Sequence, residues 1–210
     1  MHTKVAADAP RTSDIECPTL ELGAGTLNHL PIEPYTQPYD IVEPFKNLYQ
    51  QSDKLSRVRR IYTDISEIDS RLKYDRIVSI ATFEHVCNLP EVVARCGLLL
   101  SQRGTLRVGI PSEGTLLWTL AWKVSTGLEF KLKYGLDYGL LMEHEHVNTS
   151  REIEDVLDYF FSKVSRNYFG VARSLSLYQF FECGNANHAR CAEYLSSIDQ
   201  LQFYENNKVN

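Results

Sequence analysis

The sequence lacks the features that would mark it for a membrane, for disulfide bonding or for a structural metal. No apolar run approaches the ~20 residues that a helical membrane span needs, and no charged-then-apolar leader opens the chain. The five cysteines are odd in number and include no CxxC pair, so neither a disulfide framework nor a zinc knuckle is indicated. We therefore expect a cytoplasmic protein without a membrane span, and we assign no metal site.

Basic residues are scarce relative to acidic ones. The chain has 22 Lys and Arg against 27 Asp and Glu, which gives a net charge of −5. A broad nucleic-acid surface needs clustered cations that displace the counterions of the phosphate backbone, so this balance disfavours DNA as a partner. The one dense basic run, Arg57-Val58-Arg59-Arg60, is interpreted as a solvated face.

Length and composition indicate an ordinary globular chain. With 210 residues, of which 43% are hydrophobic and 23% charged, it is long enough for one domain with a full core. Residues 1–17 are small, polar and proline-containing, which predicts a flexible N-terminal arm. Residues 18–210 are expected to form the single domain, with an aromatic-rich insertion of unclear period at about 113–142.

Between residues 18 and 110, short apolar runs alternate with helical or loop segments. This spacing predicts parallel strands joined by crossovers, and therefore an α/β fold. A helix is expected after Asn88, where Pro90 suits the first turn and Gly104 suits the turn beyond the end. The five predicted strands are Leu20–Leu22, Tyr39–Val42, Arg60–Tyr62, Asp75–Ile80 and Thr105–Ile110.

The remainder of the sequence predicts two more strands and two more helices. Thr149 and Glu152 match a capping box, in which hydroxyl and carboxylate satisfy each other's free backbone N–H groups. The apolar spacing that follows predicts an amphipathic helix. Val164–Phe169 and Ser174–Phe181 are β-rich stretches separated by a short turn, which predicts an antiparallel pair. Residues 187–205 predict a terminal helix.

A tight turn after the first predicted strand is the strongest sign of a ligand site. Glu21 lies near the end of that strand, and Gly23 and Gly25 follow, which lets a ligand approach the backbone closely. A carboxylate would repel a phosphate here, whereas a ligand with an ammonium group and a ribose, such as S-adenosylmethionine (SAM), would tolerate it. Glu43 ends the second predicted strand 18 residues after Gly25, close to the ~20 typical of a ribose-binding carboxylate.

Together these stretches resemble the class I SAM-dependent methyltransferases, close to the broad group often labelled type 11. The resemblance covers roughly residues 18–185 and implies a doubly wound, Rossmann-like α/β fold with three α/β/α layers. Its seven-stranded sheet would be mostly parallel, with an antiparallel last strand. Each stretch alone is a weak signal, but their order and intervals together are specific. The matching stretches are Leu20–Gly25, Val42–Pro44, Tyr62–Ile65, Tyr74–Val86, Gly104–Pro111 and His146–Leu157.

The resemblance implies a binding site for SAM and for its product S-adenosylhomocysteine (SAH). Glu21 would lie near the amino group of SAM, Glu43 would hold the ribose, and Asp64 would hold the adenine. The residues themselves leave two alternatives open, namely Glu43 as a plain surface carboxylate and Asp64 as a helix cap. The other residues that would contact the cofactor are Gly23, Ala24, Gly25, Ile65, Ala81 and Thr82.

Three histidines are candidates for catalytic residues. His85 follows the fourth predicted strand, where a methyl acceptor would lie. The reference pKa of histidine, about 6.5, suits a general base, but a packed ring that bonds a carbonyl is an equal alternative. His144 and His146 lack the HExxH spacing of a zinc site, and we expect one of them in the acceptor pocket. The insertion could line that pocket, fill the core or form a dimer contact through Trp118, Trp122, Phe130, Tyr134 and Tyr138.

The function predicted from these residues is SAM-dependent methyl transfer to an oxygen or nitrogen of a small molecule. The chain lacks the Asn-Pro-Pro-Tyr type of loop that adenine-methylating enzymes use, and it lacks a Pro-Cys nucleophile after the fourth strand. DNA is therefore not expected as the acceptor, whereas a sugar hydroxyl or a biosynthetic intermediate is compatible. The oligomeric state stays open, with a homodimer as one alternative.

Two other functions are weighed against this one. A non-catalytic SAM-fold interaction module that uses the insertion is motivated by Thr26-Leu27, which stand where the family commonly has a third small residue. Pro31, Pro34 and Pro38 also predict a short turn plus loop as the first crossover, because proline interrupts a helix. A nicotinamide oxidoreductase is disfavoured, since its GxGxxG pattern would need glycine in place of Asn28.

Overall fold

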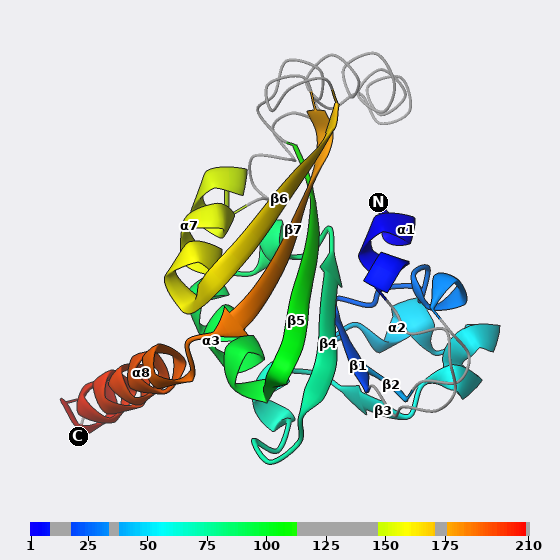
Figure 1. Ribbon diagram of the computed structural model, residues 1–210. Helices are drawn as coiled ribbons and strands as arrows, with labels where there is room; N and C mark the ends of the chain where they lie inside the picture. Colours follow the sequence, from blue (N-terminus) through cyan, green and yellow to red (C-terminus); the bar gives the residue numbers. More distant parts are fainter. Residues whose placement is uncertain (9–17, 34–37, 113–146, 171–175, 209–210) are drawn as a thin grey trace, which may run out of the picture.

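A seven-stranded sheet organises the described part of the chain (Figure 1). The computed structural model describes residues 1–8, 18–33, 38–112, 147–170 and 176–208. The strand order is β3-β2-β1-β4-β5-β7-β6, with β7 antiparallel to both neighbours and the other pairs parallel. This arrangement confirms the predicted doubly wound, Rossmann-like sheet. The strands are β1 (Thr19–Leu22), β2 (Tyr39–Val42), β3 (Arg60–Tyr62), β4 (Tyr74–Ile80), β5 (Leu100–Pro111), β6 (Phe161–Gly170) and β7 (Ser176–Ala186).

The central strands end at the same level, which gathers their following loops at one edge of the sheet. Leu22 of β1 lies beside Val42 of β2 and beside Ser79 of β4, and Val42 lies beside Tyr62 of β3. Every residue of β1 and β2 is buried, as expected for parallel strands that are covered on both faces. The carboxyl edge formed in this way is where doubly wound folds bind ligands.

The two faces of the sheet are covered unequally. Helices α3, α7 and α8 lie on one side of the sheet, and the single-turn helices α1 and α2 lie on the other (Figure 1). In its described part, the crossover after β1 contains a 3₁₀ turn, Leu30–Ile32, and no α-helix, which confirms the predicted turn plus loop. Pro31 in this turn has no N–H with which to continue a helix. The helices are α1 (His2–Val5), α2 (Lys46–Tyr49), α3 (Leu89–Leu99), α7 (Ser150–Phe160) and α8 (His188–Lys208).

Helix α3 runs directly into β5, which corrects the turn predicted at Gly104. Leu100, the residue after the helix, is already extended, with φ −71° and ψ 142°, and Gly104 lies inside the strand. A Cβ on Gly104 would come within 2.9 Å of the carbonyl oxygen of Tyr74. Glycine therefore serves the close approach of β4 and β5 at this position, where the pairing of the two strands is irregular and passes from Tyr74–Leu100 to Arg76–Thr105.

Helix α7 begins with the predicted capping box. The Thr149 hydroxyl accepts the N–H of Glu152 at 3.3 Å, and the Glu152 carboxylate accepts the N–H of Thr149 at 2.8 Å. Ile153 and Leu157 are buried on the inner face of the helix, as its apolar spacing predicts. The strands that follow pair antiparallel as expected, and their ladder is longer than the apolar stretches of the sequence.

The first eight residues pack on the sheet, which corrects the prediction of a flexible arm for this part of residues 1–17. Val5 is 0% exposed, and its carbonyl oxygen accepts the Nε–H of Arg107 at 2.7 Å. The Asp8 carboxylate lies 3.1 Å from the Arg76 guanidinium and 3.0 Å from that of Arg107. A buried guanidinium is costly unless its donors are satisfied, and the N-terminal segment supplies these acceptors.

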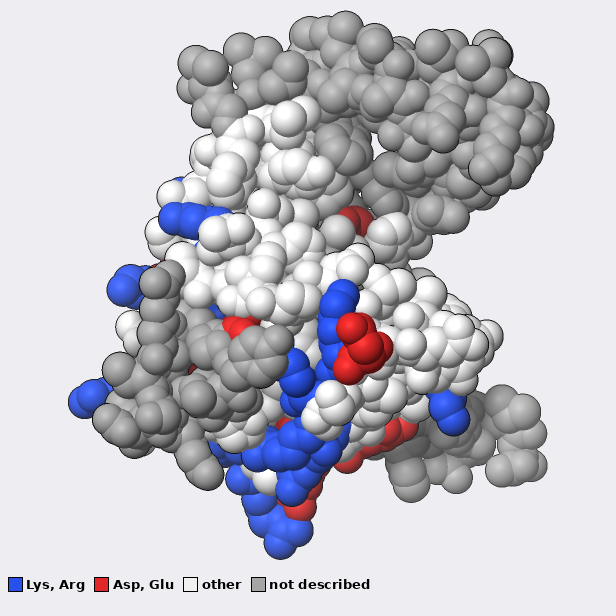
Figure 2. Space-filling view, turned by 90° about the vertical axis from the view of Figure 1, so that its right-hand side faces the viewer, with Lys and Arg blue, Asp and Glu red and all other residues white. Residues whose placement is uncertain are grey.

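The face that carries α1 and α2 has a mixed charge. Figure 2 shows Lys and Arg side chains gathered on its lower part, with Asp and Glu beside them. Arg57 donates to the carbonyl oxygens of Leu30 at 2.7 Å and Glu33 at 2.9 Å. Arg59 binds both carboxylate oxygens of Asp40, at 2.9 and 2.8 Å. Arg59 and Arg60 are exposed, as the interpretation of this run as a solvated face expects. Arg57 and Arg59 in addition fasten the loop after β1 and the start of β2, which the sequence did not predict.

Candidate functional site

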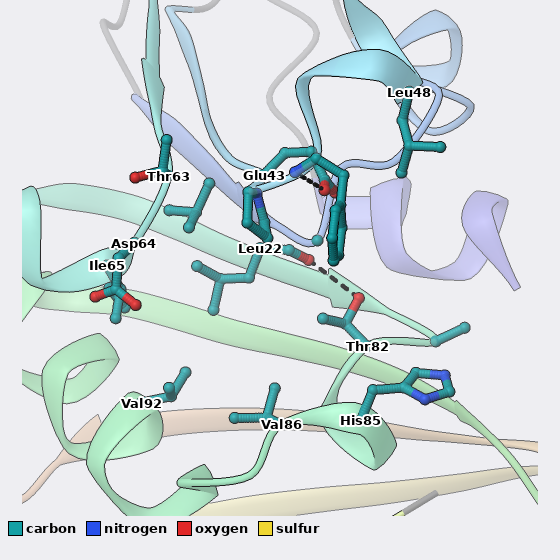
Figure 3. Close-up of a pocket in the computed structure, with 15 residues that line it drawn as sticks. Leu22, Glu43, Leu48, Thr63, Asp64, Ile65, Thr82, His85, Val86 and Val92 are labelled. Carbon is teal, nitrogen blue, oxygen red and sulfur yellow. Dashed lines mark hydrogen bonds between the residues drawn. The ribbon is translucent and has the colours of Figure 1, made fainter. Parts of the chain in front are cut away.

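A cavity of about 450 Å³ opens at the carboxyl edge of the sheet, where β1, β2, β3 and β4 end (Figure 3). Its volume lies within the ~300–1,000 Å³ typical of small-molecule and cofactor sites. The strand order reverses at β1, because the chain passes outward to β2 and β3 on one side and to β4 on the other. The lining residues are Leu22, Gly23, Val42, Glu43, Pro44, Phe45, Leu48, Thr63, Asp64, Ile65, Ala81, Thr82, His85, Val86 and Val92.

The glycine turn after β1 leaves one wall of the cavity without a side chain. Gly23 has φ +69° and Gly25 has φ +51°, in the left-handed region that favours glycine. A Cβ on Gly23 would lie 2.2 Å from Oγ1 of Thr82, so no larger residue fits there unless the end of β4 moves. Of the three predicted turn residues, Gly23 lines the cavity, whereas Ala24 and Gly25 do not.

The end of β4 closes against this turn. Oγ1 of Thr82 lies 3.3 Å from the carbonyl oxygen of Leu22 and 3.2 Å from that of Ile80, and its single proton can bond to either. Ala81 has φ +53°, a conformation that costs a residue with a Cβ ~1–2 kcal/mol, and its N–H donates to Gly109 at 2.8 Å. Ala81 and Thr82 both line the cavity, and backbone strain of this kind gathers at functional sites.

Glu43 is a buried carboxylate in the cavity wall. Its side chain accepts the N–H of Gly25 at 2.8 Å through Oε2 and the N–H of Phe45 at 2.9 Å through Oε1. Glu43 is 4% exposed, so the alternative of a plain surface carboxylate is wrong. Each carboxylate oxygen offers two lone pairs, and Glu43 therefore retains acceptor capacity for a ligand in the cavity.

Asp64 and Ile65 continue the wall after β3. Asp64 accepts the N–H of Ser66 at 2.7 Å and caps the 3₁₀ turn Ile65–Glu67, and hydrogen bonds from Ser66 lower the pKa of this carboxyl. The helix-cap alternative is confirmed, and it is compatible with ligand binding because a carboxylate has a second oxygen. Ile65 is buried and supplies an apolar surface next to this anion.

His85 is the catalytic candidate that falls in the described part of the chain. It lies in the 3₁₀ turn Phe83–His85, is exposed, and lines the cavity on the same side as Thr82 (Figure 3). His144 and His146 lie outside the described residues, and so does the aromatic-rich stretch at about 113–142.

Glu21 does not line the cavity. Its neighbours Leu20 and Leu22 pack in the core on the α3 side of the sheet, so side-chain alternation turns Glu21 to the other face. There its carboxyl accepts the hydroxyl of Tyr39 at 2.9 Å, and burial raises the pKa of Glu21 to about 8. A carboxyl that is mostly protonated at neutral pH and lies off the cavity does not fit the role predicted beside an ammonium group.

The raised pKa of Glu21 predicts a pH-dependent stability that Glu21→Gln removes. The folded pKa of about 8 lies above the reference value of 4.5, so the protonated carboxyl stabilises the fold fully below pH ~4.5, and this contribution is lost as the pH rises through about 8. The loss amounts to ~1.4 kcal/mol per pH unit between the two pKa values. The free energy of unfolding of Glu21→Gln minus that of the wild type, measured with urea, should therefore be a few kcal/mol larger at pH ~8 than at pH ~5. A difference that stays constant across this range contradicts the assignment.

Sequence reasoning missed the apolar residues that complete the cavity. Phe45 and Leu48 lie on one wall, with exposures of 67% and 45%, and exposed large apolar side chains beside a cavity indicate a binding surface. Val86 and Val92 lie on the opposite wall (Figure 3). The place of Phe45 in the cavity wall could have been inferred from its position two residues after Glu43. The places of Val86 and Val92 become visible only once the fold is known.

Within the residues that the structure describes, no set of three or more His, Cys, Asp and Glu is arranged to hold a metal ion. No helix in the same ranges combines the length and apolar character of a membrane span.

Comparison with known proteins finds similarity in structure and none in sequence. The sequence matches no protein-family model and no curated protein. The plantazolicin methyltransferase BpumL, solved with SAH, is 14% identical with a TM-score of 0.61, over 88% of this chain and 82% of that chain. A SAM-dependent methyltransferase from Thermotoga maritima, described as a possible histamine N-methyltransferase, is 15% identical with a TM-score of 0.59, over 88% of this chain and 87% of that chain.

A third similar structure belongs to a longer chain. The CurJ carbon methyltransferase is 19% identical with a TM-score of 0.58, over 89% of this chain and 54% of its own length. This protein thus spans about half of the CurJ chain. These similarities show that the chain has the class I SAM-dependent methyltransferase fold, as the resemblance of its sequence implied.

Proposed function

We propose that this chain binds SAM in the cavity at the carboxyl edge of the sheet and transfers its methyl group to a small-molecule acceptor. The observation that carries the proposal is Glu43, a buried carboxylate of the cavity wall that backbone N–H groups of Gly25 and Phe45 hold in place. A carboxylate at the end of the second strand is suited to accept the hydroxyl groups of a ribose. The fold similarity supports the same cofactor, because BpumL was solved with SAH.

The other residues of the cavity fit the remaining parts of SAM. The turn at Gly23 lets a ligand approach the backbone of β1 closely, since it carries no Cβ. Leu48, Ile65 and Val92 supply apolar surface for an adenine ring, and Asp64 supplies an anionic acceptor for its amino group. When bound, SAM would provide an electrophilic methyl group on a sulfonium.

The contribution of the chain itself is position and proton removal. Methyl transfer from a sulfonium is an in-line displacement, so holding an acceptor near attack distance supplies much of the rate. His85 lies in the cavity wall after β4 and would accept the proton of an acceptor hydroxyl. A neutral amine acceptor would not need this base.

The fold does not select the acceptor. The similar proteins are described as a plantazolicin methyltransferase, a carbon methyltransferase and a possible histamine N-methyltransferase. The proposal of a small-molecule acceptor therefore rests on the acidic charge of this chain and on the absence from its sequence of the loop that adenine-methylating enzymes use.

Calorimetric titration of the purified full chain with SAM and with SAH tests the proposal. We expect a micromolar dissociation constant, about −8 kcal/mol, and copurified SAM or SAH in the mass spectrum of the denatured protein. A chain that binds neither compound contradicts the proposal. A screen of metabolites with a labelled methyl donor then separates the enzyme, which labels an acceptor, from the non-catalytic interaction module, which binds SAH and labels none.

A further inference from the structure

The segment that leads into α7 is hydrogen-bonded to the turn that carries His85. The N–H groups of Val147 and Asn148 both donate to the carbonyl oxygen of Glu84, at 2.9 and 3.1 Å. The Asn148 side chain adds two more hydrogen bonds. Its Nδ2 lies 2.8 Å from the carbonyl oxygen of Phe83 and 2.7 Å from that of Val86.

The two side-chain bonds use the full donor capacity of Asn148. A side-chain amide nitrogen carries two protons. One bonds to the carbonyl oxygen of Phe83, before His85 in the chain, and the other to that of Val86, after His85. The spacing of these two carbonyls is therefore fixed by the geometry of a single planar NH₂ group. No other residue type of similar size offers two donors from one atom without also bringing a charge.

The turn depends on these outside donors because it has little regular structure of its own. It is a single 3₁₀ turn. Within it, the N–H of His85 donates to the carbonyl oxygen of Thr82 at 2.9 Å, and the N–H of Val86 donates to that of Phe83 at 3.4 Å. A lone 3₁₀ turn is a weak element with poor hydrogen-bond geometry. His85 and Val86 nevertheless line the cavity (Figure 3), so contacts outside the turn contribute to their position.

Helix α7 provides a firm base for this contact. Asn148 directly precedes Thr149, the N-cap residue of the helix. Ile153 and Leu157 anchor the helix in the core at 1% and 0% exposure. The donors of Asn148 therefore come from a packed helix. Within the turn, Phe83 is itself buried in the core at 0% exposure, whereas His85 is exposed, so the bonds of Asn148 act on a turn that the core holds at one end only.

We propose that Asn148 is a positioning residue, which sets the place of His85 and Val86 in the wall of the cavity. This role rests on the proposed function, because the position of His85 and Val86 affects binding only if the cavity holds a ligand. Asn148 itself does not line the cavity, so it acts through the turn.

The test compares Asn148→Leu with Thr149→Ala. Leucine keeps the size of the side chain, stays uncharged and removes both donors, whereas Thr149→Ala weakens the same end of α7 and leaves the bonds to the turn intact. Loss of both hydrogen bonds to the turn should raise the dissociation constant for SAH about tenfold or more in Asn148→Leu. The Thr149→Ala value should stay within about twofold of the wild type.

A second measurement reports on the turn directly. We expect the NMR signals of the His85 imidazole to shift in Asn148→Leu, and the backbone amide of Val86 to exchange with solvent at least about tenfold faster, since the local structure that protects it is weakened. Neither change is expected in Thr149→Ala. Where Asn148→Leu fails to fold, Asn148→Ser, which keeps one donor, is used in its place.

The outcomes separate this inference from the proposed function. Wild-type affinity and unchanged His85 and Val86 signals in Asn148→Leu overturn the positioning role, as do equal changes in Thr149→Ala. A wild type that binds no SAH overturns the proposed function, and the affinity comparison can then no longer be made. The NMR comparison then still decides whether Asn148 sets the place of the turn.

Discussion

Gly23→Ala is expected to abolish SAH binding and to lower the free energy of unfolding by about 2–5 kcal/mol. The added Cβ would lie 2.2 Å from Oγ1, 2.4 Å from Cγ2 and 2.9 Å from Cβ of Thr82, so the whole Thr82 residue would have to move. The backbone at φ +69° adds a conformational cost of its own. Calorimetry with SAH and urea unfolding measure the two effects.

Two other glycines separate the steric cost from the backbone cost. Gly25 has φ +51° but nothing within 4 Å of an added Cβ, so Gly25→Ala should cost ~1 kcal/mol through the backbone alone. Gly184 of β7 has open space and no positive φ, and Gly184→Ala should stay within about 0.5 kcal/mol of the wild type. Similar losses at all three positions would contradict the steric argument for Gly23.

The strands next to the site could be predicted from the sequence to within one residue at each end. β2 and β3 begin and end where predicted, and β1 and β4 each start one residue earlier than predicted. Parallel strands that are buried on both faces form mostly apolar runs, which are visible without knowledge of their partners. This applies to β1, β2 and β4, whereas β3 is largely exposed. β5 was misjudged at its start, because Leu98–Leu100 continues the apolar face of α3 while Leu100 already has the extended backbone of the strand.

The packing of the N-terminal segment could not be predicted from local pattern. Small and polar residues indicate a loose segment, and no periodicity marks Val5 as a core residue. Its burial follows from Arg76 and Arg107, two arginines that lie inside strands and need acceptors there. Those partners are about 70 to 100 residues away in the chain, a distance at which sequence spacing carries no information.

The candidate site was predicted well where each residue follows a strand end, and poorly where side-chain direction decides. Glu43, Asp64 and Thr82 lie one or two residues after the ends of β2, β3 and β4, and all three reach the cavity. Glu21 lies inside β1, where it alternates with Leu20 and Leu22, which pack on the α3 side of the sheet. The period of two was visible in the sequence and would have turned Glu21 away from the ligand.

Glu43→Ala is expected to weaken SAH binding about 100-fold. It removes the acceptor proposed for the two ribose hydroxyls, and a hydrogen bond to a charged group is worth about 1.5–3 kcal/mol, where 1.4 kcal/mol is a factor of ten. The variant also leaves the N–H groups of Gly25 and Phe45 without their acceptor. Urea unfolding at the temperature of the titration therefore has to confirm that the variant is folded.

Glu67→Ala is the matched control for Glu43→Ala. Glu67 is also a carboxylate that holds the backbone beside the cavity, but it does not line the cavity. Glu67 accepts the N–H of Thr63 at 3.0 Å and also its hydroxyl, and Thr63, unlike Glu67, is a lining residue. This variant loosens the rim but keeps the ribose acceptor, so its dissociation constant for SAH should stay within about threefold of the wild type. Losses of equal size in both variants would mean that Glu43 only holds the backbone.

The 2′-deoxy analogue of SAH tests the contact between Glu43 and the ribose itself. The wild type should bind the analogue about tenfold or more weakly than SAH, because one hydroxyl no longer donates to the carboxylate. Glu43→Ala should bind the two ligands alike, since it has already lost the acceptor, and the difference between the proteins gives the coupling energy of the pair. If Glu43→Ala discriminates between SAH and its deoxy analogue as strongly as the wild type, the hydroxyl is recognised by another residue.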